Sequence, residues 1–177
     1  MANRDTDETP SRARRLDSMP HDASRASIAA NQRDTPAEGL FLAYAAIVPI
    51  GAGAMAALVI SPGWRPATIR LTIIWSAAIL SFLAGVRRGD SFHTPARPKP
   101  DQLLAVFGTF AASLVALALP RPASAIFALF VGFAGVGLLD ALAARRGDAP
   151  RFFARIRPPQ MGAALLCLAV LLVAVLR

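Results

Sequence analysis

The sequence ATIRLTIIWSAAILSFLAGV, residues 67–86, followed directly by Arg87 and Arg88, decides the class of fold. Its only charged residue is Arg70, so it lacks the charged stripe that a surface helix of a soluble protein needs. Apolar and polar residues do not alternate with a period of two, which argues against a strand of a transmembrane β-barrel. A run of about twenty apolar residues has the length of a helix that crosses a bilayer. We therefore expect a membrane-spanning helix here.

Four further apolar runs surround this one and are separated by breaks rich in proline and glycine. Apolar residues make up 55% of the chain, and the mean hydropathy is +0.48. The five runs would extend about 24 to 33 Å as helices, against a hydrocarbon core of about 30 Å. The sequence thus predicts an all-α fold, an integral membrane bundle of five transmembrane helices in residues 40–177, with spans at about 40–60, 67–86, 103–119, 123–144 and 161–176.

Residues 1–39 differ sharply in composition from the rest of the chain. They mix acidic and basic residues with Ser, Thr, Asn and Pro, and they contain no apolar run that could be a signal peptide. Such a segment buries too little apolar surface to offset its chain entropy. We expect a disordered polar tail, with Met19 as an alternative translation start.

Basic residues predict the orientation. Fifteen of the nineteen Lys and Arg residues lie in the tail and in the connections after the second and fourth runs. By the positive-inside rule, these parts face the cytoplasm and the C-terminus lies outside. The preference for Arg over Lys and the abundance of Ala indicate a GC-rich bacterial genome, hence the bacterial cytoplasmic (inner) membrane, with a periplasmic or extracellular C-terminus. The same account explains the net charge of +8, so we expect no nucleic-acid partner.

No constellation of catalytic or cofactor-binding residues is present in the sequence. The histidines His21 and His93 have no Cys or carboxylate partners at metal-ligand spacing, and the single Cys167 lies within the last apolar run. Ser91 and His93 have no orienting carboxylate nearby, as a serine nucleophile and its base would need. We expect no enzyme activity, no metal and no cofactor.

Small residues four apart favour close packing of helices in lipid. Four of the five runs contain such stripes, and they predict a compact bundle with lipids around it and a membrane-protein partner or a second copy as its possible neighbour. The residues expected at helix contacts are Gly53, Ser81, Gly85, Gly108, Gly132 and Gly135.

Asp140 is the most suggestive single residue, because a carboxylate within a membrane helix is costly and is a functional hypothesis by default. It lies near the end of the fourth run, on the same side as the end of the second. We expect an ion pair between Asp140 and Arg87 or Arg88, with Arg145 as another candidate partner. A proton or ion relay and simple exposure at the interface are the alternatives.

Two other features concern the membrane. Pro49 removes one backbone hydrogen bond from the first run and is expected to kink it. The segment before the fifth run places bulky apolar side chains between cations, a pattern typical of a segment that lies in the lipid interface and binds anionic headgroups. Its residues are Arg151, Phe152, Phe153, Arg155 and Arg157.

The run WSAAILSFLAGVRRG, residues 75–89, resembles the signature of the transmembrane protein 69-like family, small multispanning proteins of unknown function from bacteria and mitochondria. Tyr44, Pro49, Asp140 with Arg145-Arg146, and residues 150–157 match in the same order, so the resemblance covers about residues 40–176. Relatives carry His-Trp where this chain has Arg87-Arg88, and Trp where it has Phe152. The resemblance implies no catalytic residue. Any chemistry of that His-Trp pair would be missing here.

Two hypotheses about function follow. The first is a non-enzymatic accessory, assembly or scaffold component of the membrane. The alternative is a small transporter or channel subunit that uses Asp140 and the Pro49 kink.

Overall fold

The computed structural model describes residues 41, 44–90, 100–145 and 151–177, all within the unit Ala37–Arg177. The expected tail, residues 1–39, lies outside them. Helices dominate the described part of the chain, as predicted. They are α3 (Val48–Val59), α4 (Arg65–Asp90), α5 (Pro100–Ala118), α6 (Pro122–Arg145) and α7 (Arg151–Leu176).

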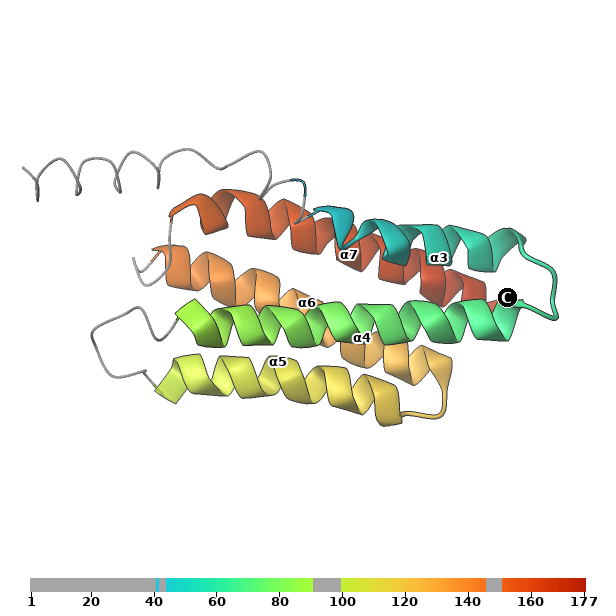
Figure 1. Ribbon diagram of the computed structural model, residues 1–177, viewed down its shortest axis with the longest axis horizontal. Helices are drawn as coiled ribbons and strands as arrows, with labels where there is room; N and C mark the ends of the chain where they lie inside the picture. Colours follow the sequence, from blue (N-terminus) through green and yellow to red (C-terminus); the bar gives the residue numbers. More distant parts are fainter. Residues whose placement is uncertain (1–40, 42–43, 91–99, 146–150) are drawn as a thin grey trace, which may run out of the picture. The chain divides into compact units, whose positions relative to one another are not determined.

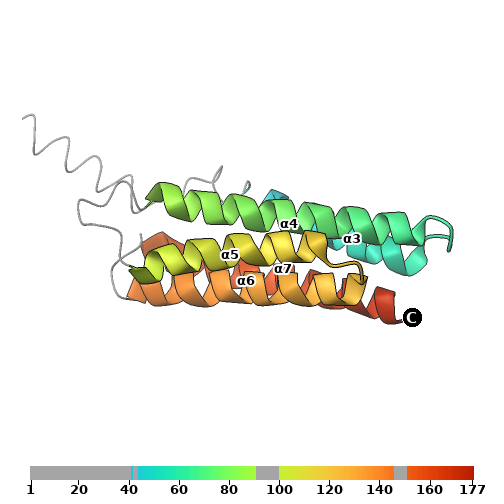
Figure 2. The same ribbon diagram turned by 90° about the horizontal axis from the view of Figure 1, so that it is seen from below.

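Successive helices run in opposite directions and form a closed ring (Figure 1). Each helix packs against the next one in the chain, and α7 returns to pack against α3. Helix α4 also packs against α6, across the ring. Figure 2 shows the same helices turned by 90°. Because the helices alternate in direction, the C-terminal ends of α4 and α6 meet the N-terminal end of α7 at one end of the bundle.

Three helical segments are long and apolar enough to cross a membrane: Arg65–Gly89, Pro122–Ala143 and Arg157–Leu176. The apolar helices Val48–Val59 and Leu103–Ala118 are shorter. With 12 residues, α3 extends about 18 Å, well below the roughly 30 Å of a hydrocarbon core. The chain is therefore a helical protein of the membrane-spanning type, and its described residues include three apolar helices of full spanning length.

Pro49 accounts for part of this difference from the predicted first span. Residues 44–45 are helical, a turn follows at residues 46–47, and Pro49 lies in the first turn of α3, which begins at Val48. The helical run is therefore interrupted just before the proline. Proline is well tolerated in a first turn, where its missing N–H would have no intrahelical acceptor. The Ile50 N–H donates to the Ile47 carbonyl, and the Ala46 carbonyl instead accepts from the Trp75 indole Nε1–H at 3.0 Å. This bond joins the start of α3 to α4.

Pro158 and Pro159 also behave differently from the prediction. The sequence pattern treats them as a break before the fifth span, whereas α7 continues through both, from Arg151 to Leu176. Both proline side chains are exposed, so their rings project away from the bundle. Membrane helices tolerate internal proline when neighbouring groups satisfy the freed carbonyls. The segment expected to lie separately in the interface is thus continuous with the last helix.

The core of the ring is built from aliphatic side chains and one aromatic side chain. Phe133 of α6 is fully buried beside Leu80 of α4 and Leu168 of α7 in one cluster. Hydroxyl groups in the core bond to helix carbonyls, as when Thr109 donates to Ala105 at 2.8 Å. Because buried polar groups in such a core have acceptors within their own helix, they add little desolvation cost.

Two of the predicted packing glycines lie at close helix contacts. A Cβ on Gly53 of α3 would overlap the side chain of Thr72 of α4, and a Cβ on Gly132 of α6 would overlap Leu80 and lie 3.2 Å from the Cβ of Ala112. Ser81 of α4 also joins two helices, because its Oγ lies 2.7 Å from Ser113 Oγ of α5. Since the Ser113 hydroxyl donates to Phe110, Ser81 is the donor between the two.

The other three predicted glycines make no such contact. A Cβ built on Gly85, Gly108 or Gly135 would meet nothing within 4 Å. Spacing identifies small residues on one helix but not which face the other helices cover. The predicted packing role of these three glycines stays a prediction. The glycines that do contact a neighbour and were not predicted are Gly51, opposite Cys167 Sγ at 3.3 Å, and Gly137, opposite Met161 Cβ at 3.1 Å.

These contacts make Gly53→Ala and Gly85→Ala a matched pair. Gly53→Ala should destabilise the protein by about 1–3 kcal/mol, because Thr72 is β-branched, buried and bonded to Thr68, so it cannot move aside without cost. Gly85→Ala should be neutral or stabilising by up to about 1 kcal/mol, because alanine favours a helix and the site is open. Unfolding in mixed detergent measures both. Equal losses would contradict the packing described here.

Candidate functional site

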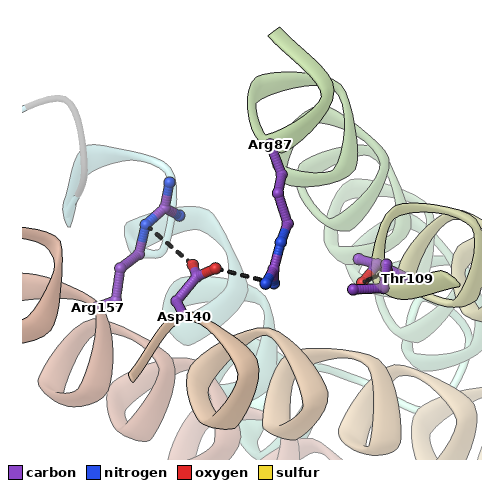
Figure 3. A network of polar contacts seen from close by, with 5 residues as sticks. Arg87, Thr109, Asp140 and Arg157 are labelled. Carbon is purple, nitrogen blue, oxygen red and sulfur yellow. Dashed lines mark hydrogen bonds and ion pairs between the residues drawn. The ribbon is translucent and has the colours of Figure 1, made fainter. Parts of the chain in front are cut away.

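Three charged side chains from three helices meet at the end of the bundle where α4 and α6 finish (Figure 3). Arg87 lies in the last turn of α4, Asp140 lies near the C-terminal end of α6, and Arg157 lies in the N-terminal part of α7. Figure 3 shows the Asp140 carboxylate between the two guanidinium groups. We call Arg87, Asp140 and Arg157 the charge cluster.

The contacts within the charge cluster use both carboxylate oxygens. Arg87 Nη1 lies 2.9 Å from Asp140 Oδ1, and Arg157 Nε lies 3.5 Å from Asp140 Oδ2. The exposed fractions of the three side chains are 19% for Arg87, 13% for Asp140 and 11% for Arg157. Charges at this depth are screened less than surface pairs, so each guanidinium stabilises the ionised carboxylate.

The contact of Arg87 is electrostatic more than directional. Although Nη1 is close to Asp140, this buried nitrogen has no hydrogen-bond partner of acceptable geometry. Its N–H groups therefore do not point at the carboxylate oxygen. A guanidinium held in this way keeps donor capacity that Asp140 does not use.

The sequence predicted Arg87 or Arg88 as the partner of Asp140, and the structure brings Arg87 to it. Arg88 is half-buried and makes interactions of its own. Arg157 was predicted as part of a lipid-interface segment and was missed as a second partner of Asp140. The available signal was its position, as the last cation before the fifth span on the same side as Asp140. The side chain of Arg145 lies outside the described residues.

The remaining residues of the expected interface segment form the first turns of α7. The side chains of Arg151, Phe152, Phe153 and Arg155 lie outside the described part of the structure, as do His21, Ser91 and His93. The predicted position of this segment in the lipid interface therefore stays a prediction. Among the residues that are described, no group of three His, Cys, Asp or Glu side chains could hold a metal ion.

Arginines at the opposite end of the bundle bond to backbone instead of carboxylates. Arg65 Nε donates to the Ala57 carbonyl at 2.9 Å, and Arg70 Nη2 lies 3.4 Å from the Leu117 carbonyl, near the end of α5. These bonds satisfy carbonyl groups in the last turns of α3 and α5, which have no partner within their own helix. Arg70 is therefore far from Asp140 along the bundle.

Two hollows on the sides of the bundle are lined almost entirely by apolar atoms. The larger one, about 700 Å³, lies between α5 and α6 and is bordered by Gly108, Ala112, Phe127 and Val131. The smaller one, about 430 Å³, lies between α3 and α4 beside Trp75. Neither is lined by a residue of the charge cluster.

Residues 35–173, most of the chain and all of the ring except its last turn, match the family described as protein of unknown function (DUF3429). The chain belongs to this family. No curated protein and no solved structure matches it. The charge cluster of this DUF3429 protein lies wholly within the matched residues, so it is part of the family's domain and not of an appended tail.

The charge cluster makes a prediction about stability. Asp140→Asn removes the carboxylate that both partly buried guanidiniums contact and should cost about 1–3 kcal/mol, between the values for exposed and for buried ion pairs. Arg87→Gln should cost more than Arg157→Gln, because its contact is shorter, 2.9 against 3.5 Å. Unfolding in mixed detergent gives the three values.

The control is Arg121→Gln, which removes an exposed arginine at the opposite end of the bundle. It should change the stability by less than about 0.5 kcal/mol. If Asp140→Asn proves as harmless as this control, the charge cluster does not stabilise the fold.

Proposed function

We propose that this protein is a non-enzymatic accessory, assembly or scaffold component of the bacterial cytoplasmic membrane, with all five helices within the bilayer. The observation that carries the proposal is the open hollow between α5 and α6. Small residues make up much of its lining, which also includes the exposed side chains of Phe127 and Val131. Small residues let another helix approach closely, which a lipid chain does not require.

Gly108, one of the glycines without a close contact within this chain, supports the same proposal. Gly108 borders the hollow, is exposed and has no neighbour within 4 Å of an added Cβ. In a lone bundle, glycine at this point of a helix costs about 1 kcal/mol relative to alanine. A partner helix that packs against Gly108 would offset that cost. We propose a membrane-protein partner at this face, and a second copy of the chain is the other outcome of the test.

Short helices can still be spans in this arrangement. The ring pairs α3 with α4 and α7, both of which contain a segment long enough to cross a membrane. A short span is accommodated by local thinning of the bilayer and by arginines at its ends that reach the headgroups. Arg65, which bonds to Ala57 at the end of α3, is such an arginine.

The orientation follows from the arginines. Arg87, Arg88 and Arg157 lie at one end of the bundle, and the positive-inside rule makes that end cytoplasmic. The N-terminus would then be cytoplasmic and the C-terminus external. The proposed relation to the transmembrane protein 69-like family rests on residues 75–89, which form the C-terminal half of α4 and include Arg87.

Transport is less well supported than scaffolding. Asp140, the carboxylate that a transport pathway would use, is held by two arginines near the end of the bundle. A carboxylate used as a relay would have to leave these partners in each cycle. Loss of flux in Asp140→Asn without loss of folding would revive the transport proposal.

Cysteine labelling tests the orientation. In a Cys167→Ser background, we expect an impermeant maleimide added to intact cells to label Arg177→Cys and Ser61→Cys and to leave Gly147→Cys unlabelled until the cells are lysed. Ser61 is exposed in the connection between α3 and α4, and residue 147 lies in the connection between α6 and α7. The reverse pattern would overturn the proposed topology.

Co-purification tests the scaffold role. The full chain, isolated in mild detergent, should bring down a membrane protein in stoichiometric amount, and Gly108→Leu should release it because the bulky side chain fills the hollow. Gly85→Leu is the matched control, because Gly85 is equally open but does not border that hollow. A strictly monomeric, partner-free protein contradicts the proposal, and self-association that Gly108→Leu abolishes assigns the hollow to a second copy.

A further inference from the structure

We propose that the α5 side of the bundle is a surface for a locally thinned bilayer, in which the hydrocarbon layer beside α5 is about 5 Å thinner than usual. The partner of this surface is lipid, and the proposal rests on the membrane placement proposed above. Its basis is a step at the end of the bundle where α4 begins and α5 finishes.

Two arginines of α4 define the step. Arg65 Nε donates to the carbonyl of Ala57, in the last turn of α3, at 2.9 Å. Arg70 Nη2 donates to the carbonyl of Leu117, in the last turn of α5, at 3.4 Å. Along α4 these arginines are about 7.5 Å apart, at about 1.5 Å per residue. The bonds indicate that α5 ends several ångströms short of α3, and both ribbon views show α5 ending short of the start of α4 (Figure 1, Figure 2).

The apolar part of α5 is short as well. It runs from Leu103 to Ala118, after the polar residues Asp101 and Gln102, and extends about 24 Å. The spanning segment of α7, Arg157–Leu176, has 20 residues and extends about 30 Å, which equals an ordinary hydrocarbon core of about 30 Å. The bundle therefore presents apolar surfaces of different height to the lipid.

Arg70 places the same limit on α4. Its side chain is exposed, and its bond to the Leu117 carbonyl holds the guanidinium at the level of the last turn of α5. Between Arg70 and Arg87, which belongs to the charge cluster at the other end, α4 offers about 25 Å of uncharged helix. A cation surrounded by hydrocarbon is costly. Helices α4 and α5 thus fit a hydrocarbon layer of the same reduced thickness.

Tilting the bundle does not remove this mismatch. Tilt reduces the height that a helix spans, so it accommodates a helix that is too long and not one that is too short. A short helix is accommodated by thinning of the bilayer or by association with other helices. Association is what we propose for the hollow between α5 and α6, so the mismatch adds a driving force for that partner.

Spin labels along α5 test the proposal in the full chain, reconstituted into vesicles of dioleoylphosphatidylcholine. In a Cys167→Ser background, single cysteines replace Leu104 and Ala118, near the two ends of α5, and Ala111, midway between them. All three positions are exposed. Relaxation of each label by a water-soluble nickel chelate and by oxygen reports its depth, because oxygen concentrates in the hydrocarbon layer and the chelate stays in water.

A label at Leu176, the exposed last residue of α7, gives the reference value for the membrane surface. We expect the labels at Leu104 and Ala118 to match this reference and to have a nickel-to-oxygen ratio several times that of Ala111. The two end positions are about 21 Å apart along α5, so a flat hydrocarbon layer of about 30 Å cannot place both at its surfaces.

The outcomes separate this proposal from the membrane placement on which it rests. If the label at Leu104 or at Ala118 is as oxygen-accessible as the label at Ala111, the bilayer is not thinned beside α5, while the placement stands. If the label at Ala111 is as accessible to nickel as the reference, α5 does not lie in the bilayer and both proposals are wrong.

The chain length of the lipid provides a second test on the unmodified protein. Dipalmitoleoyl- and dierucoylphosphatidylcholine form fluid, zwitterionic bilayers that differ in thickness. We expect a Tm higher by about 2–4 °C in the thinner dipalmitoleoyl bilayer, because less deformation is needed to match α5. An equal Tm, or a higher one in the thicker bilayer, would overturn the proposal.

Discussion

The Asp140 carboxylate joins three helices of the bundle, α4, α6 and α7. It contacts Arg87 of α4 at 2.9 Å and Arg157 of α7 at 3.5 Å, from its own position on α6. In lipid, the hydrophobic effect does not drive one apolar helix toward another, so helix order depends on close packing and on polar contacts. Many small steric contacts favour the ring in general, whereas this one cluster specifies which helix ends meet.

Other contacts in the bundle agree with that arrangement. The Trp75 indole bonds to the Ala46 carbonyl and joins α3 to α4, and Ser81 bonds to Ser113 and joins α4 to α5. Gly132 and Gly137 let α6 approach α4, α5 and α7. The helix that carries Asp140 thus also makes close steric contacts with three of its neighbours. Together these contacts define a rigid frame with an open apolar hollow on the α5 and α6 face.

The helical class and the approximate position of each helix follow from the sequence, because apolar runs and breakers are local properties. The partner of Asp140 follows in part, since charge alternation alone places Arg87 on the same side. Helix ends near proline do not follow. Whether Pro49 starts a helix or kinks one, and whether α7 passes through Pro158 and Pro159, depends on which neighbouring groups satisfy the freed carbonyls. Which small residues contact another helix does not follow either. The spacing of Gly85, Gly108 and Gly135 resembles that of Gly53 and Gly132, but only the arrangement of the helices decides which face is covered.

The central claim is that Asp140 couples α4 to α6 through charge. A double-mutant cycle with Arg87→Gln and Asp140→Asn tests it most directly, with the free energy of unfolding in mixed detergent as the measured quantity. The account predicts a favourable coupling of about 1–3 kcal/mol, so that the double variant loses much less than the sum of the single losses. Strictly additive losses would contradict it.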